Sequence, residues 1–312
     1  MNNWQKKGLI YRPNNGLSWA KSHAQIPTVD LVEKKILRIF FSTRDESNRS
    51  HITYMDVDSE NPQQIFYLHQ QPLLKLGLTG TFDDCGIMPT SIVTYKGLKY
   101  LYYIGWNVRN TVPYHNAIGL AISEDNGLTF NKLFTGPIMD RNTLDPYFCG
   151  TACVKIENSI WRNWYLSCTK WIQVNGKSEP LYNLKYAESL DGINWKREGI
   201  IAIDLKNEAE GGIARASVIK DDEIYKMWYC YRGHTDYRVN KNQSYRIGYA
   251  ESLDGIIWKR MDNVNIIEPS EDGWDSEMVA YPEVIDIDNR RLMFYNGNGF
   301  GQSGFGYAEI NL

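Results

Sequence analysis

Apolar and polar residues follow a pattern that returns along the chain. The stretch 184–197 recurs almost letter for letter at 247–260, and weaker copies stand at 118–130 and, truncated, at 305–310. The two strongest copies begin about 60 residues apart, and a fixed period of this kind indicates a repeat architecture. The fold is therefore best predicted from the repeat unit.

Each copy predicts a β-hairpin. An apolar, aromatic run leads into a turn with Asp and Gly, and a second run begins at Trp or Phe. Two further strand-like runs precede each hairpin, as at 216–220 and 224–231, so the unit is a four-stranded antiparallel meander. Equivalent strand pairs stand at 27–42, 89–105, 152–169 and 282–296. Five units predict an all-β fold, a five-bladed β-propeller.

The two ends of the chain support the same prediction. The last unit stops after its third strand, at 307–310, whereas residues 3–10 read in register with 194–201, the fourth strand of another unit. An N-terminal strand in the last blade would close the ring and remove an exposed sheet edge. We expect one domain over 1–312; a β-sandwich or two unrelated β-domains is the alternative.

Composition and charge narrow the class of protein. A net charge of −3 in 312 residues gives no electrostatic case for binding nucleic acid or an anionic membrane. No signal-peptide core or membrane span is evident, so we expect a cytoplasmic protein. The odd, scattered cysteines predict reduced thiols: Cys85, Cys149, Cys153, Cys168 and Cys230. No Cys/His spacing suggests zinc, and we expect no metal or cofactor.

The candidate chemistry lies on one face of the predicted propeller. The Asp-Gly turns, with Ser123, Asp125, Asp191 and Asp254, fall on the opposite face and are expected to be structural. The starts of the first strands supply the catalytic candidates Glu210, Asp145, Asp84, Glu277 and His23. The loops and strands beside them supply the substrate-binding candidates Arg44, Trp106, Arg109, Trp171, Arg215, Arg232, His234 and Asn298. Stacking rings, Arg, Asn and acids around one depression are typical of a carbohydrate site; acids that merely make turns are the alternative.

The blades, the Ser-x-Asp-Gly-x-x-Trp hairpins and the acids at the strand starts resemble the five-bladed furanosidase-type propellers of glycoside hydrolase families 43, 32, 68 and 130. Sialidases share a similar Asp-containing turn but usually have six blades. The resemblance implies an orienting Asp at Asp145-Pro146 and an acid Glu at Glu210-Gly211. The base Asp of the first blade is not matched, because His23 and Gln25 stand there.

That departure leaves the reaction open. Glycoside hydrolysis normally needs two carboxylates. Glu210 would be the acid, its pKa raised by neighbouring acids, and the second role would fall to Asp84, Glu277, His23 or an external reagent such as phosphate. The arginines and His234 would then bind phosphate, or the anionic group of an acidic or nucleotide-linked sugar, or else form salt bridges. Glu283 is expected to point into the central channel.

We therefore predict a glycosidase-like enzyme that acts on a carbohydrate or sugar-derived small molecule. The alternatives are a phosphorylase or transferase in polysaccharide metabolism, or an inactive propeller that binds a saccharide or a protein partner.

Overall fold

The computed structural model describes residues 4–13 and 16–312, and β-strands dominate this part of the chain. A single short helix, α1 (Asn298–Gly301), occurs among these residues. Asn3, the first residue of the predicted N-terminal strand, lies outside them. No helix in the described ranges has the length and apolar character needed to cross a bilayer.

The strands of the described residues form five antiparallel groups of four, here called meanders 1 to 5. Meander 1 contains β2 (Ser22–Glu33), β3 (Ile36–Arg44), β4 (Ser50–Asp58) and β5 (Ile65–Leu68). Meander 2 contains β6 (Gly86–Tyr95), β7 (Leu98–Val108), β8 (Tyr114–Ser123) and β9 (Asn131–Lys132). Meander 3 contains β10 (Cys149–Glu157), β11 (Ile160–Val174), β12 (Lys177–Ser189) and β13 (Lys196–Ile203). Meander 4 contains β14 (Glu210–Asp221), β15 (Ile224–Gly233), β16 (Arg246–Ser252) and β17 (Lys259–Arg260). Meander 5 contains β18 (Ala280–Ile287), β19 (Arg290–Asn296), β20 (Phe305–Asn311) and β1 (Gln5–Tyr11).

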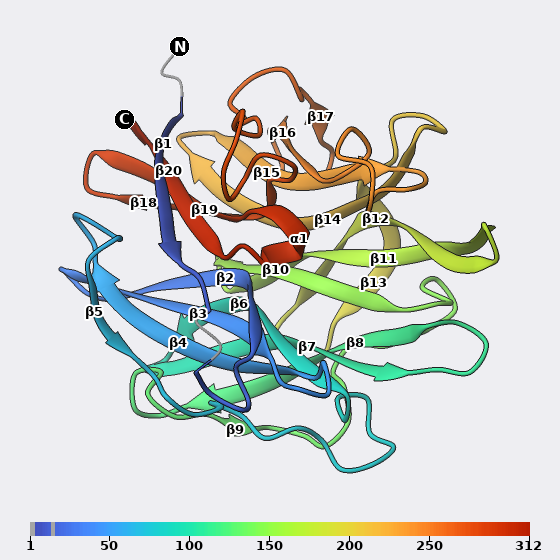
Figure 1. Ribbon diagram of the computed structural model, residues 1–312, viewed down its shortest axis with the longest axis horizontal. Helices are drawn as coiled ribbons and strands as arrows, with labels where there is room; N and C mark the ends of the chain where they lie inside the picture. Colours follow the sequence, from blue (N-terminus) through green and yellow to red (C-terminus); the bar gives the residue numbers. More distant parts are fainter. Residues whose placement is uncertain (1–3, 14–15) are drawn as a thin grey trace.

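The two ends of the chain meet in meander 5. Strand β1 pairs antiparallel with β20, with Lys6 opposite Ala308, and Figure 1 shows the two strands side by side. The indole of Trp4 also donates a hydrogen bond of 2.9 Å to the carbonyl of Asn265. The predicted exchange of the N-terminal strand into the last unit is confirmed as a strand pairing.

The first strands of the meanders surround a common centre (Figure 1). They contact one another in the order β2, β6, β10, β14, β18, and β18 contacts β2 again. Single parallel pairs also join β4 to β6 and β12 to β14. The ends of strands that are far apart in sequence are thereby brought to the same place.

The predicted Asp-Gly turns are confirmed in their local structure. Ser189 Oγ donates to Asp191 Oδ1 at 2.9 Å and accepts from the backbone N–H of Gly192 at the same distance. Gly192 has φ +75°, a left-handed conformation that costs glycine little. The carbonyl of Gly192 accepts a hydrogen bond of 2.8 Å from the hydroxyl of Tyr102 in meander 2. Each such turn therefore also ties one meander to its neighbour.

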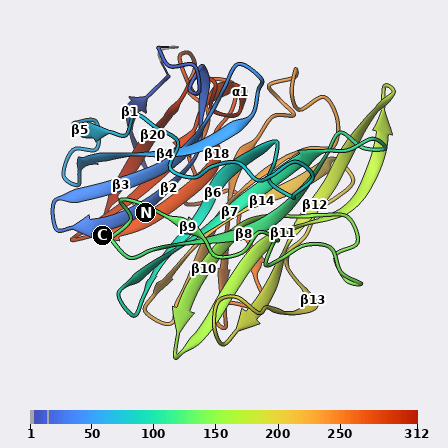
Figure 2. The ribbon, with the colours of Figure 1, turned by 90° about the horizontal axis from the view of Figure 1, so that it is seen from below.

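The same contact recurs between meanders 3 and 4, where the indole of Trp164 donates to the carbonyl of Gly255 at 2.8 Å. Large aromatic side chains such as Trp161 and Trp228 fill the space between sheets and are fully buried. The five cysteines are free thiols, as predicted, and four of them are buried. One hairpin departs from this regular plan, because β11 and β12 project beyond the neighbouring turns (Figure 2).

Candidate functional site

A cavity of about 440 Å³ opens where the five first strands converge. Each first strand contributes one lining residue or more, among them Ile26, Met88, Thr151, Ala214 and Tyr281. The walls are strongly aromatic, with Trp106, Tyr114, Phe148, Tyr182, Tyr237, Tyr245, Tyr281 and Phe300. Its volume and aromatic lining are typical of small-molecule sites, which span about 300–1,000 Å³.

Backbone strain gathers at this cavity. His23, Ile26, Asn48, Tyr281 and Phe300 line it, and their φ angles lie between +54° and +62°. Such angles are uncommon for residues other than glycine, and for a β-branched residue such as Ile26 they are outliers. Strain of this kind is concentrated at functional sites, where the surrounding structure enforces it. The cavity is therefore the leading candidate for the functional site.

Two polar side chains present unused hydrogen-bonding atoms to the cavity. Arg44, at the end of β3, donates from Nε to Gln25 Oε1 and from Nη1 to Asn48 Oδ1, both at 3.0 Å. Its Nη2 has no hydrogen-bond partner among the described residues, nor does the side-chain amide of Asn116 on β8. These groups are available to the hydroxyls or anionic groups of a ligand.

His23 is neutral at physiological pH. Burial, and then the neighbouring charge of Arg44, lowers the pKa of the imidazole to about 4. Its Nδ1 lies 2.8 Å from the hydroxyl of Ser22, and Nε2 has no hydrogen-bond partner among the described residues. Of the five catalytic candidates predicted from the sequence, His23 is the one that the structure places in the cavity lining.

No Asp or Glu belongs to the described residues that line this cavity. This contrasts with the arrangement expected for glycoside hydrolysis, in which two carboxylates flank the scissile bond. The predicted pair, Asp145 and Glu210, lies outside the lining, and both side chains are engaged by cations.

Asp145 is completely buried in a network of donors. Its carboxylate accepts hydrogen bonds from Tyr165 at 3.0 Å, Ser167 at 2.7 Å, Lys185 at 2.9 Å and Arg197 at 3.1 Å. Burial by itself would raise the pKa of Asp145, but the hydrogen bonds from Lys185 and Ser167 outweigh it and lower the pKa. An ionised carboxylate held in this way balances the charges of Lys185 and Arg197, and its predicted catalytic role stays a prediction.

Glu210 is also held by a cation. Arg260 donates to both of its carboxylate oxygens at 2.8 Å, and the backbone N–H of Lys206 donates to one of them at 2.7 Å. Arg260 also bridges to Asp262 at 2.9 Å. The like-charge surroundings expected from the sequence are therefore not what Glu210 contacts, because a guanidinium lies against it. Its role as an acid stays a prediction that these contacts do not favour.

An ion pair between the start of the first strand and the fourth strand of a sheet recurs in four meanders. An acid before or at the start of the first strand meets a cation from the fourth strand and, in three of the four, a tyrosine hydroxyl from the second. Two further examples are Asp83 with Tyr103 and Lys132, and Asp275 with Tyr295 and Lys6. The acids Asp83, Asp145, Glu210 and Asp275 thus share one contact pattern, which links strands within each sheet.

Three further predicted residues serve local structure. Asp84 accepts a hydrogen bond of 2.8 Å from a backbone N–H four residues earlier, and its other oxygen is buried without a described partner. Glu277 is exposed, and its backbone N–H donates to Asn298 Oδ1 at 2.7 Å. His234 Nδ1 lies 2.8 Å from the carbonyl of Glu208. None of these lines the cavity.

The two predicted tryptophans lie at different depths. Trp106 lines the cavity, and its Nε1 donates to Ser50 Oγ at 2.9 Å. Trp171 packs behind the wall, with its ring centre 5.5 Å from that of Tyr114 and 5.8 Å from that of Phe148. Trp106 can contact a ligand, whereas Trp171 supports rings that can.

Arg215 of β14 joins the first strands of other meanders. It is fully buried, donates to the carbonyls of Thr90 and Pro27, and forms an ion pair with Glu283. Burial raises the pKa of Glu283. The expected orientation of Glu283 towards the centre stays a prediction, and its contact with Arg215 is consistent with it.

Arg232 lies behind the aromatic wall and is 1% exposed. Its guanidinium carbon is 3.8 Å from the ring centre of Tyr237 and 4.8 Å from that of Tyr182. Its Nε donates to the Tyr182 hydroxyl at 2.9 Å, and that hydroxyl also contacts the hydroxyl of Tyr245. Arg232 therefore orients tyrosines of the cavity and adds a buried positive charge.

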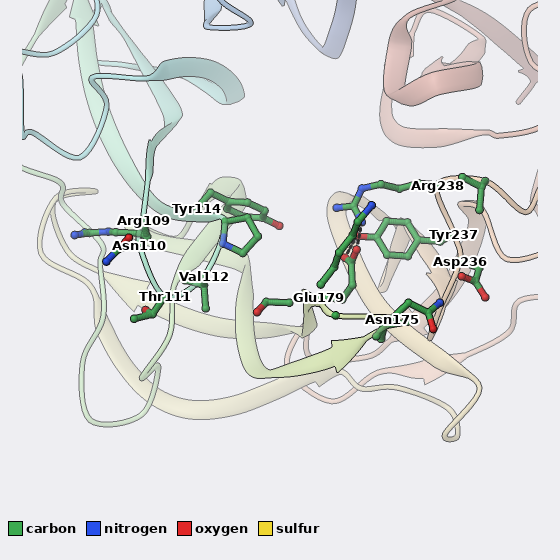
Figure 3. A pocket seen from close by; sticks show the side chains of 16 residues that line it. Arg109, Asn110, Thr111, Val112, Tyr114, Asn175, Glu179, Asp236, Tyr237 and Arg238 are labelled. Carbon is green, nitrogen blue, oxygen red and sulfur yellow. Dashed lines mark hydrogen bonds and ion pairs between the residues drawn. The ribbon is translucent and has the colours of Figure 1, made fainter.

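A second, outer cleft of about 720 Å³ adjoins the cavity. It lies between the β7–β8, β11–β12 and β15–β16 connections, and Tyr114, Tyr237 and Arg238 line both spaces. Figure 3 shows Arg238 and Tyr237 meeting Glu179, which accepts a hydrogen bond of 2.7 Å from the Tyr237 hydroxyl and forms an ion pair with Arg238. Arg109 lines only the outer cleft.

Most residues of the aromatic wall are not among the candidates predicted from the sequence, which are mainly charged residues and tryptophans at strand starts and loops. A signal was present in the repeat. Asn116, Tyr182 and Tyr245 each stand seven residues before the Ser of an Asp-Gly turn, at 123, 189 and 252. All three line the cavity, since equivalent positions of the third strands end at the same place.

Comparison with solved structures identifies the fold. A glycoside hydrolase superposes with a TM-score of 0.70 at 18% identity, covering 98% of this chain and 90% of that one. A thermostable family-43 glycoside hydrolase gives 0.65 at 18% identity, with coverage of 96% and 91%. The GH32 β-fructofuranosidase of Bombyx mori gives 0.63 at 13% identity, covering 99% of this chain and 61% of that one. No family model matches the chain.

Two curated proteins of Mycobacterium tuberculosis are similar in sequence. "Uncharacterized protein MT1551" of strain CDC 1551 and "Uncharacterized protein Rv1502" of strain H37Rv are each 37% identical to the chain over 307 residues. The match covers 98% of this chain and 99% of each relative. The chain shares its fold with the glycoside hydrolases above, and it belongs to the family of these mycobacterial proteins.

Proposed function

We propose that the protein is a carbohydrate-active five-bladed β-propeller, a single domain over 1–312, whose central cavity binds a saccharide. Five meanders, cyclic contacts among their first strands and the pairing of β1 with β20 support five blades and a closed ring. The likeness to family-43 and GH32 enzymes supports a sugar as the ligand.

One observation carries the choice of site. The cavity combines aromatic walls with polar groups that lack partners, and sugar rings present apolar faces and hydroxyl edges that suit such a lining. Trp106 and the tyrosines supply the apolar faces, while Asn116 and Arg44 supply donors and an acceptor. Strained backbone at the same place supports a site built for binding.

The cavity favours saccharide binding, or transfer without a carboxylate pair, over hydrolysis by two carboxylates. No described lining residue is an acid, and both Asp145 and Glu210 are engaged in ion pairs. Hydrolysis is the second candidate, and the fold shared with glycoside hydrolases favours it. It would need Glu210 to leave Arg260, or an external nucleophile such as phosphate.

Calorimetric titration with a panel of mono- and oligosaccharides tests the binding site. We expect one saturable site, weakened about tenfold or more in Asn116→Leu because a hydrogen bond to the ligand is lost. Asn61→Leu is the matched control, since Asn61 is exposed and remote from the cavity lining. Absence of saturable binding by every saccharide would contradict the proposal.

Turnover of aryl glycosides and oligosaccharides, with and without phosphate, separates binding from catalysis. Cleavage that disappears in a folded Glu210→Gln variant would establish the carboxylate reaction. Cleavage that requires phosphate would establish phosphorolysis. Binding without cleavage would support a saccharide-binding propeller.

A further inference from the structure

We propose that the saccharide of the central cavity carries an anionic group, a phosphate or a carboxylate, which docks on Arg44. This inference rests on the proposed function, because it names the class of ligand for the same cavity. It follows from how the cavity distributes charge.

Arg44 has no carboxylate partner among the described residues. Its two hydrogen bonds go to the neutral amides of Gln25 and Asn48. Other largely buried arginines are neutralised, as Arg38 is by Asp56 and Arg291 by Asp286. A partly buried charge without a counter-ion is costly, so this position calls for an anion from outside the chain.

A second cation without an ion-pair partner among the described residues lies close behind the wall. Arg232 donates to the Tyr182 hydroxyl and to the carbonyls of Pro180 and Gly233, and the nearby carboxylate of Glu179 that feels its charge forms its ion pair with Arg238. Its charge is screened little, because the side chain is almost completely buried. The positive charges of Arg44 and Arg232 therefore act on the cavity from two sides.

Nothing in the described lining cancels this charge. His23 stays neutral near pH 7 and no acid lines the cavity. Arg238 on the rim is neutralised by Glu179 of the outer cleft, so it contributes little net charge. The net potential favours an anionic ligand over a neutral sugar.

The free edge of Arg44 suits the proposed group. A guanidinium presents a planar fork of donors that matches the oxygens of phosphate and carboxylate, and Nη2 is unoccupied by described residues. The aromatic walls remain available for the sugar ring. A larger substituent, such as a nucleotide, would extend past Tyr237 into the outer cleft.

Calorimetry with matched ligands tests the inference. The probes are hexoses, their 1-phosphates, the corresponding hexuronates, nucleoside-diphosphate hexoses and inorganic phosphate. We expect at least one anionic derivative of a hexose to bind about tenfold to a hundredfold more tightly than the neutral hexose itself. The phosphate and carboxylate arms identify which anion is recognised.

Variants locate the effect. Arg44→Gln should abolish the preference for the anion, so that the anionic and the neutral sugar bind with similar affinity, whereas Arg44→Lys should keep part of the preference. Arg141→Gln, which removes an exposed arginine outside both spaces, should change nothing. Circular dichroism and thermal unfolding verify that each variant is folded.

The outcomes separate the two proposals. Neutral sugars that bind as tightly as their anionic counterparts would overturn this inference and leave the proposed function standing. An anion preference that survives in Arg44→Gln would also overturn it. No binding by any probe would overturn both.

Discussion

At the scale of single residues, the acids before or at the first strands neutralise cations. Asp145 holds Lys185 and Arg197, and Glu210 holds Arg260. Removing one partner of a buried ion pair leaves the other charge uncompensated, which costs far more than the pair itself contributes. These acids therefore matter first for stability.

Asp145→Asn should lower the free energy of unfolding by about 3–5 kcal/mol, because Lys185 and Arg197 lose their counter-ion. Urea denaturation measures the change. Asp272→Asn, at an exposed position, is the control and should shift stability by less than about 0.5 kcal/mol. An Asp145→Asn protein of unchanged stability would contradict the structural role, and loss of turnover without loss of stability would favour a catalytic one.

His23 should make stability depend on pH. Its folded-state pKa of about 4 lies below the unfolded value of 6.5, so the unfolded chain binds more protons between these values. The free energy of unfolding should therefore fall as the pH is lowered from about 6.5 to about 4. His23→Asn tolerates the left-handed backbone and should reduce this slope. Denaturation at several pH values measures it, and equal slopes in both proteins would contradict the account.

Residue types alone did not reveal these partners. Asp145 and Arg197 are 52 positions apart, and Glu210 and Arg260 are 50 apart. Each acid was visible at a strand start, but its cation belongs to the fourth strand of the same meander. Acids and cations separated by about 50 residues within one repeat unit predict ion pairs between the first and fourth strands of a sheet.

At the scale of elements, the hairpin turns hold the sheets together. A Cβ on Gly192 would lie 2.6 Å from the Trp161 ring, whereas a Cβ on Gly176 would meet nothing within 4 Å. Both glycines have φ +75°. The two positions therefore separate backbone strain from steric contact.

Gly176→Ala should cost about 1–2 kcal/mol from the left-handed backbone alone. Gly192→Ala should cost about 1–3 kcal/mol more, because its methyl group overpacks the buried indole. Urea denaturation of both variants checks the difference. Equal losses would show that the contact between this turn and Trp161 is not tight.

The hairpin repeat predicted the strands but not the wall of the cavity. Tyr182 and Tyr245 are not among the candidates predicted from the sequence, since alternation along a strand shows which face a residue takes and not what lies across the centre. They line one cavity together with Asn116 only because the meanders converge at the centre. The aromatic character of the site is thus a property of the assembled sheets.

At the scale of the whole molecule, β1 completes meander 5 and covers the edge of β20. Deleting residues 1–12 would expose that edge and leave the buried Asp275 without Lys6. We expect a lower urea midpoint and concentration-dependent association. Denaturation and size-exclusion chromatography measure these, and a monomer of unchanged stability would contradict the proposed closure.

The all-β architecture and the pairing of the two chain ends were predictable because a period and a displaced strand are visible in the sequence. The site was predictable only in part: His23, Arg44 and Trp106 reach the cavity. Arg215 and Arg232 lie near the centre but beneath and behind the lining, since burial depth depends on contacts among several meanders.

We place the functional site in the aromatic cavity beside Arg44. A crystal structure of the protein soaked with a hexose 1-phosphate would locate the ligand. We expect the sugar against the aromatic wall, with its phosphate oxygens about 3 Å from the Arg44 guanidinium. A ligand found only in the outer cleft, or beside Asp145 and Glu210, would overturn this assignment.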